Sequence, residues 1–143
     1  MEIKINRIQI EDATGINSLS LQLGYPLSIP ETENNIAEMI KLEDHEAFVA
    51  RDKLQIVGWI HVFSTLRLES NPFVEIGGMV VHQGYRGKGI GRLLIWQAKD
   101  WAVKKNAGTL RVRCNTKRIE AHQFYEAMGF IVSKDQRVFV LSL

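Results

Sequence analysis

Apolar and polar residues alternate along several stretches of the chain, and such alternation predicts β-strands. The alternation is clearest in residues 3–10, where isoleucines recur between polar side chains. Asp52 and Lys53 separate two such stretches and mark the turn of a hairpin. Gly77 and Gly78 interrupt another stretch, which indicates a β-bulge or a close approach of another backbone or a ligand. The predicted strands cover residues 3–10, 47–51, 55–67, 72–82, 109–115 and 130–141.

Elsewhere the apolar residues recur every three or four positions, which is the spacing of an amphipathic helix. Ile16, Leu19 and Leu23 share one face of the first such segment. Gly108 and Gly129 follow the last turns of two others, as glycine does at helix C-termini. The predicted helices cover residues 11–23, 31–42, 89–108 and 118–129. Hairpins followed by a strand–helix–strand–helix–strand tail predict a single α+β (mixed α/β) domain over residues 1–143, built around one central sheet.

Composition narrows the classes of function. The 143 residues carry a formal net charge of +2, which is too small to indicate nucleic-acid binding. No apolar run approaches the roughly 20 residues that cross a bilayer, and no signal-peptide pattern opens the chain, so we expect no membrane partner. The single cysteine, Cys114, excludes an internal disulfide and suits a reducing compartment, so we expect a cytoplasmic protein. The four histidines show no spacing that indicates a metal site.

The turn before the third predicted helix is rich in glycine and in cationic side chains. It lies within the sequence MVVHQGYRGKGIGRLL, residues 79–94, and its charged and glycine positions are Arg86, Gly87, Lys88, Gly89, Gly91 and Arg92. The N–H groups that open a helix have no partner within it and carry part of its positive dipole, so a phosphate could bind against this backbone. A tight turn whose glycines only relieve crowding is the alternative.

Two known phosphate-binding loops do not fit this turn. A P-loop has serine or threonine after its lysine, whereas Gly89 follows Lys88. A dinucleotide-binding loop has the spacing G-x-G-x-x-G early in a strand–helix–strand unit, whereas this turn has G-x-G-x-G after the hairpins. A nicotinamide or flavin site is therefore not predicted.

The segment RGKGIG, read as R-x-x-G-x-G, resembles the pyrophosphate loop of the GNAT N-acetyltransferase superfamily. The segment from Asn115 to Phe130 reads N-x5-A-x2-F-Y-E-x2-G-F and is similar to that family's closing signature. The order of elements also matches over nearly the whole chain. The resemblance implies a mixed, mostly antiparallel sheet of about six to seven strands flanked by about four helices. It also implies an N-acetyltransferase that uses acetyl-CoA as co-substrate and no metal.

The resemblance assigns the cofactor contacts. Backbone groups beside the paired glycines would pair with the pantetheine arm, and one amide there would stabilise the thioester oxyanion. The amides and cations of the turn would bind the pyrophosphate. The implied cofactor-binding residues are Met79, Val80, Val81, Arg86, Gly87, Lys88, Gly89, Ile90, Gly91, Arg92, Asn115 and Phe124.

Two residues are predicted to be catalytic. Tyr125 matches the family's general acid, which protonates the CoA thiolate; a helix residue with its hydroxyl in water is the alternative. Glu75 is the candidate base for the amine, directly or through water, and an exposed carboxylate on a strand is its alternative. The histidines lack partner spacing and are interpreted as surface or strand residues. Cys114 is interpreted as a small buried residue of its strand.

The acceptor site implied by the resemblance includes Tyr25 and Glu69, whose region would receive an amine-bearing small molecule or peptide. Aminoglycosides, polyamines, amino acids and protein N-termini all carry such an amine. A homodimer is expected, because members of the family are often dimers. Two other functions stay open: a CoA-binding sensor without turnover, and an enzyme that binds nucleotide phosphates at the same glycine-rich turn.

Overall fold

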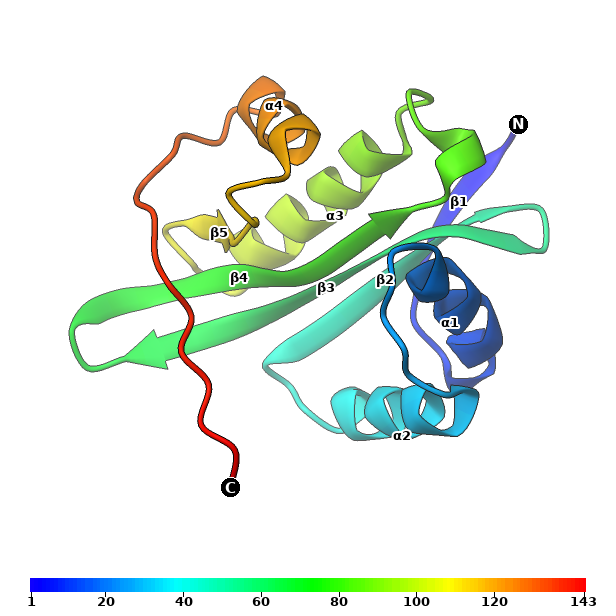
Figure 1. Cartoon of the computed structure of the whole chain (residues 1–143), viewed down its shortest axis with the longest axis horizontal. Helices are drawn as coiled ribbons and strands as arrows, with labels where there is room; N and C mark the ends of the chain where they lie inside the picture. The colour runs from blue at the N-terminus through cyan, green and yellow to red at the C-terminus, as the bar shows by residue number, and fades with distance from the viewer. The chain divides into compact units, whose positions relative to one another are not determined.

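Five strands form one sheet in the order β1-β2-β3-β4-β5, and the computed structural model describes all residues from 1 to 143 (Figure 1). Neighbouring strands are antiparallel except β4 and β5, which are parallel. The elements are β1 (Ile3–Arg7), η1 (Ile10–Asp12), α1 (Ala13–Gln22), α2 (Ile29–Ile40), β2 (His45–Asp52), β3 (Gln55–Arg67), β4 (Ser70–Val81), η2 (Gln83–Tyr85), α3 (Ile90–Lys104), β5 (Leu110–Val112) and α4 (Ile119–Ala127). This is the expected α+β class, and no helix has the length and apolar character needed to cross a membrane.

The chain divides into two compact units, Met1–Val112 and Arg113–Leu143. In the first unit, α1 and α2 cover one face of the sheet and α3 covers the other (Figure 1). A Cβ added to Gly15 of α1 would lie 2.8 Å from the side chain of Ile56, so helix and strand are in direct contact. The core between α1, α2 and the sheet consists of Ala13, Ile16, Leu19, Ile36, Val49, Ile56 and Val80.

A buried ion pair joins the start of α1 to the end of β2. The carboxylate of Asp12 accepts a hydrogen bond from the guanidinium of Arg51, and its second oxygen accepts one from the backbone N–H of Gln9 at 2.8 Å. The Asp12 side chain is 4% exposed, so both bonds compensate for the water that the carboxylate loses. Helix α1 is thereby fixed against the β2–β3 hairpin.

The connection from α1 to α2 is also held by specific bonds. Ser28 caps α2: its hydroxyl accepts the N–H of Glu31 at 3.2 Å, and the Glu31 carboxylate accepts the N–H of Ser28 at 3.0 Å. The amide of Asn17, buried in α1, donates to the carbonyl of Leu27. These bonds hold the segment that contains Tyr25 between the two helices.

A β-bulge interrupts the pairing of β3 with β4 at the paired glycines. His61 lies opposite Gly78 and Val62 opposite Ile76, so Gly77 is the extra residue of β4. The bulge predicted from the sequence is confirmed. The nearest neighbours of the two glycines are side-chain rings of β3 and not another backbone: a Cβ at Gly78 would lie 2.9 Å from the Trp59 ring, and one at Gly77 would lie 2.6 Å from His61 Nδ1.

Beyond this bulge β4 has no partner on its other side. Only Val74, Glu75 and Ile76 pair with β5. Residues 78–81 continue to pair with β3, but β5 ends at Val112 and does not follow them. Because alternate residues of a strand direct their N–H and C=O groups to each neighbour, this part of β4 presents an unpaired backbone edge.

Several predicted element boundaries were wrong. The sheet has five strands, fewer than the six to seven expected, because residues 130–141 form no strand. In that segment Val138, Phe139 and Val140 are each at least 80% exposed. The predicted strand at 109–115 is limited to Leu110–Val112, so Cys114 lies outside it and is half-buried rather than buried. The helix predicted at 11–23 is a 3₁₀ turn followed by α1.

We predict that Gly77→Ala lowers the free energy of unfolding by about 1–3 kcal/mol, because its methyl group would overlap the His61 ring. Urea unfolding measures the change. Gly108→Ala is the matched control, since nothing lies within 4 Å of a Cβ there. The cost at Gly77 should fall when His61 is also changed to Ala. An equal effect of the two glycine substitutions would contradict the overlap.

Candidate active site

The glycine-rich turn lies between η2 and α3 and keeps an open, left-handed backbone. Gly87 and Gly89 have φ values of 78° and 86°, and nothing lies within 4 Å of a Cβ at either position. Glycine is therefore needed for the backbone conformation and not for relief of crowding, because other residues adopt such φ values only with strain. This result disfavours the alternative in which the glycines only avoid side-chain contacts.

Unpaired amides open helix α3. The first hydrogen bond of the helix runs from the N–H of Leu93 to the carbonyl of Gly89 at 3.1 Å. The N–H groups of Ile90, Gly91 and Arg92 consequently have no partner within the helix. Residues 86–89 are exposed, and the Ile90 side chain is 1% exposed, so Ile90 can contribute to a site only through its backbone. The turn combines free amides with the cations of Arg86, Lys88 and Arg92.

Tyr85 anchors this turn to the sheet. Its hydroxyl donates to the carboxylate of Asp52 at the end of β2, at 2.8 Å. That hydrogen bond lowers the pKa of Asp52 and raises the pKa of Tyr85. The ammonium of Lys88 lies 5.2 Å from the centre of the Tyr85 ring. At the start of η2, the imidazole of His82 accepts the N–H of Gly84 at 2.9 Å.

The unpaired edge of β4 contains the predicted pantetheine-binding residues. Met79, Val80 and Val81 pair with β3 on one side and have no strand on the other. The Val80 side chain is 3% exposed and belongs to the core, so only its backbone is accessible to a ligand. The edge leads directly through His82 and η2 into the glycine-rich turn. A ligand with an amide-bearing arm and a phosphate group could contact the β4 edge with its arm and the glycine-rich turn with its phosphate.

Glu75 lies on β4 two residues before the bulge and is half-buried. It faces Phe63 on β3 and Arg111 on β5 in the strand register. The guanidinium of Arg111 stacks 3.8 Å from the centre of the Phe73 ring, and this cation–π contact fixes the Arg111 side chain. Glu75 therefore lies on the same side of the sheet as the rings that pack over the bulge.

Two histidines that the sequence left unpaired meet on this side of the sheet. Nδ1 of His45 on β2 lies 3.0 Å from Nε2 of His61 on β3. Their rings stack at 5.2 Å, and the Phe63 ring stacks on His45 at 5.3 Å. Both are strand residues, as interpreted from the sequence, and the structure adds that they are partners of each other. Their spacing of 16 residues gives no local signal; only the hairpin register, which pairs His45 with Phe63, brings them together.

Residues 113–143 contain the remaining predicted residues. Asn115 forms a turn in which its side-chain oxygen accepts the N–H of Lys117 at 2.9 Å. The backbone carbonyl of Asn115 is 2.8 Å from Nε2 of His122 on α4. The amide NH₂ of Asn115 is the part of the side chain that remains for a ligand.

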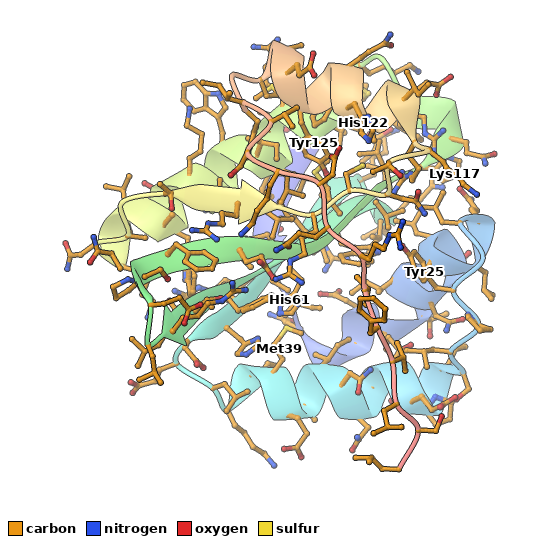
Figure 2. All side chains as sticks on the ribbon, turned by 60° about the vertical axis from the view of Figure 1, so that its left-hand side comes forward. Tyr25, Met39, His61, Lys117, His122 and Tyr125 are labelled. Atoms are coloured by element: carbon orange, nitrogen blue, oxygen red, sulfur yellow. The ribbon has the colours of Figure 1, made fainter.

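Tyr125 lies on α4 (Figure 2) and is in contact with two other aromatic rings. Phe124 and Phe130 contact it edge-on, with ring centres 5.3 Å and 5.5 Å away. Burial by these neighbours raises the pKa of Tyr125, and the nearby Cys114 raises it further. The hydroxyl is therefore protonated throughout the neutral range, as a proton donor must be.

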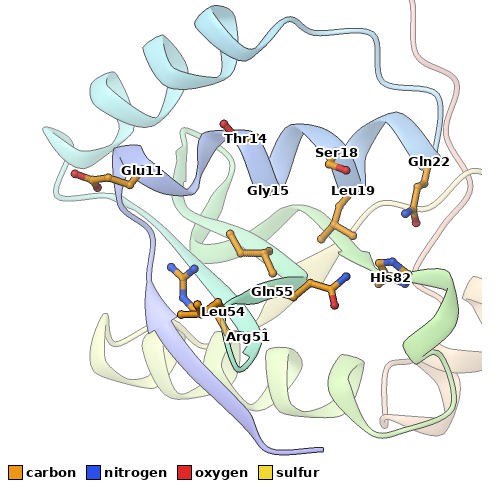
Figure 3. Close-up of a pocket in the computed structure, with 11 residues that line it drawn as sticks. Glu11, Thr14, Gly15, Ser18, Leu19, Gln22, Arg51, Leu54, Gln55 and His82 are labelled. Carbon is orange, nitrogen blue, oxygen red and sulfur yellow. The ribbon is translucent and has the colours of Figure 1, made fainter.

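The predicted acceptor residues are separated along the first unit. Tyr25 lies in the connection between α1 and α2 and is 52% exposed, and Glu69 lies exposed in the turn between β3 and β4. A cavity of about 400 Å³ lies between α1 and the β2–β3 turn (Figure 3). Its lining includes Glu11, Ser18, Gln22, Arg51, Gln55 and His82, and none of the predicted site residues.

Comparison with known proteins identifies the family. The model of the acetyltransferase (GNAT) family matches residues 15–130. Streptothricin acetyltransferase of Escherichia coli is 30% identical over 101 residues, which cover 71% of this chain and 56% of that enzyme. The chain therefore spans little more than half of that relative. The uncharacterized N-acetyltransferase YhdJ of Bacillus subtilis (strain 168) is 24% identical over 112 residues, 78% of this chain and 79% of YhdJ.

A solved structure supports the fold. AAC(6')-Iy, in complex with the bisubstrate analogue CoA-S-monomethyl-acetylneamine, superposes with a TM-score of 0.88 over 100% of both chains, at 15% sequence identity. The acetyltransferase family model matches most of the chain. The matched residues include the bulged strand β4 and the glycine-rich turn. The chain belongs to the GNAT acetyltransferase family.

Proposed function

We propose that the protein transfers the acetyl group of acetyl-CoA to a primary amine of a small molecule or peptide, by direct attack in a ternary complex. The observation that carries the proposal is the unpaired edge of β4, residues 77–81, which runs into a turn with free amides at Ile90, Gly91 and Arg92. Backbone edge and amides match the two halves of CoA: an amide-bearing arm and a pyrophosphate.

In this proposal the chain binds the cofactor mainly through its backbone. Met79 and Val81 pair with the pantetheine amides as a short strand would, and Asn115 donates its amide NH₂ to the same arm. The amides of residues 87–92 hold the pyrophosphate, helped by the α3 dipole and the neighbouring cations. Phe124 packs beside the cofactor.

The proposed chemistry is one acyl transfer accompanied by three proton transfers. The amine nitrogen forms a bond to the thioester carbon, the carbon–sulfur bond breaks, and its electron pair leaves on sulfur. Glu75 attracts the cationic amine and accepts its first proton, directly or through water, before the attack. The Tyr125 hydroxyl gives its proton to the thiolate, and the second proton of the amine, lost as the nitrogen bonds to the carbon, restores that hydroxyl. An alkylammonium has a pKa of about 10, so loss of a proton must precede attack.

The acceptor is proposed to be cationic. Glu75 and Glu69 supply negative charge, and the names of the relatives point to basic antibiotics: streptothricin for one and an acetylneamine analogue for another. A panel of streptothricin, an aminoglycoside, a polyamine and a peptide with a free N-terminus tests these classes. Release of CoA thiol is the readout. Tight CoA binding without thiol release from any amine would favour the CoA-binding sensor.

We predict that Gly89→Glu abolishes measurable CoA binding, because a carboxylate would occupy the proposed phosphate position. The left-handed φ also costs the variant about 1–2 kcal/mol of stability. Calorimetric titration with CoA measures the affinity, and ATP and NAD should bind the wild type far more weakly.

Gly24→Glu is the matched control for this variant. Gly24 also has a left-handed φ, 82°, with nothing within 4 Å of a Cβ, and it lies outside the turn. It should lose similar stability and keep its CoA affinity. Retained CoA binding by Gly89→Glu would overturn the assignment of the turn.

We also predict that Tyr125→Phe slows thiol release by about 100-fold or less without abolishing it. A CoA thiolate, whose thiol has a pKa of about 8.5, can leave without a proton. Because the pKa of Tyr125 is raised above its ordinary value of 10.0, the hydroxyl should stay protonated up to at least about pH 10. The wild-type rate should therefore not fall through loss of this proton below that pH. An unchanged rate for the variant at pH 7 would exclude the acid role.

We further propose that the protein is a homodimer. Support comes from the apolar side chains near the C-terminus, of which Val138, Phe139, Val140 and Leu141 are each at least 80% exposed. Sedimentation velocity should give twice the mass of the chain, and removal of residues 137–143 should shift it to the monomer. A monomeric wild type would contradict the proposal, and a dimeric truncation would exclude this segment as the contact.

A further inference from the structure

His61 of the histidine pair lies directly against Gly77 of the β4 bulge. Trp59, His61 and Phe63 project from β3 on the face that α1 and α2 cover, since Trp59 packs against the core on that side. Figure 2 shows His61 between the sheet and α2, with Met39 of α2 directed toward the sheet. The indole N–H of Trp59 is shielded from solvent there and has no hydrogen-bond partner, so this face contains an unused donor as well as the histidines.

The two nitrogens of His61 face different groups. Nε2 is 3.0 Å from Nδ1 of His45. Nδ1 is directed at the bulge, because a Cβ at Gly77 would lie only 2.6 Å from it. The Phe63 ring packs against both imidazoles, with ring centres 5.3 Å and 5.4 Å away. His61 is thus held with one nitrogen toward its partner and the other toward the backbone that the proposal pairs with the thioester end of CoA.

His61 is neutral at neutral pH. Burial, and the neighbouring His45, lower its pKa from 6.5 to about 4. The other charged groups on this face include Glu75 on β4, Arg111 on β5 and Arg67 at the end of β3, and both guanidiniums lie over the Phe73 ring. A neutral imidazole has one donor and one acceptor nitrogen. If Nε2 carries the proton and donates it to His45, the lone pair of Nδ1 is free on the side of the bulge.

We propose that His61 and His45 form the proton exit for the acetyl transfer, an inference that rests on the proposed function. Before the amine nitrogen attacks the thioester carbon, its ammonium form gives a proton to Nδ1 of His61. The proton on Nε2 of His61 moves to Nδ1 of His45, and the half-buried His45 ring releases its own Nε2 proton to water. Exchange with water resets both rings between turnovers. In this scheme His61 replaces Glu75 as the acceptor of that first proton, and Glu75 only attracts the cationic acceptor. The second amine proton and the carbon–sulfur electron pair move as in the proposed function.

A relay residue of this kind does not need a high pKa. The proton passes through His61 without remaining on it, so the ring must only be neutral with both nitrogens correctly directed. Its low pKa keeps it neutral over the whole range in which an acetyltransferase would work. The relay matters most where the amine is largely protonated, that is, on the acid side of the pKa of the amine.

The test is the pH profile of thiol release by His61→Gln. Glutamine can hydrogen-bond to His45 but cannot relay a proton. We expect kcat to fall by about 100-fold at pH 7 and to approach the wild-type value near pH 10, where the amine is already free. CoA affinity should be unchanged. The double variant with His45→Gln should be no slower than His61→Gln alone, since both residues act in one path.

Two further variants separate the relay from a structural role. His61→Ala should regain rate when imidazole is added, because the small ring can replace the lost one beside Gly77. His82→Gln is the matched control: its single imidazole bond, to the N–H of Gly84, can be replaced by a glutamine oxygen, so its pH profile should be that of the wild type.

The outcomes are distinct. A wild type that binds CoA but releases no thiol with any amine overturns the proposed function, and the relay with it. An active wild type whose His61→Gln variant keeps its rate at pH 7 overturns the relay alone. A variant that is equally slow at every pH also overturns the relay, because a purely structural loss would not depend on the protonation of the amine.

Discussion

The structure depends on an incomplete pairing of β4. This strand has β3 beside it along its whole length but β5 for only three residue pairs. Unsatisfied backbone groups are costly when they are buried, so an open strand edge in the middle of a fold needs water or a ligand as its partner. The same strand ends in a turn whose amides are free because they open α3. Both proposed halves of the cofactor site are therefore backbone features, which explains why so few side chains of the turn are buried or bonded to other parts of the chain.

Much of the fold could be predicted from the sequence. The alternation in residues 55–67 and the helical spacing of Ile90, Leu94, Ala98 and Trp101 reflect how these side chains are buried in the structure. The final strand at 130–141 could not be predicted correctly, because alternation of apolar residues reports a tendency to pair and not the presence of a neighbouring strand. The same limit applies to Cys114, which continues the alternation of β5 although the strand has ended.

The candidate site also contains residues that the sequence could predict and residues that it could not. The glycines of the turn carry a local signal, because a left-handed φ and an absent Cβ concern a single residue. His45 and His61 carry none, because their contact depends on the register of β2 against β3, and that register includes a shift near Ala50. The paired glycines gave the correct bulge, yet the sequence could not say which rings would lie over it. Residues that act through cross-strand neighbours are the ones that a single sequence conceals.

The contact between Gly77 and the His61 ring also couples the substitutions that these two positions can accept during evolution. A side chain at 77 and an imidazole at 61 cannot occupy the same space, so the chain could accept one only after giving up the other. Among homologues, larger residues at 77 should therefore accompany smaller ones at 61. Divergence of this face would require an intermediate with small residues at both positions, in which the bulge is kept while the ring above it is absent.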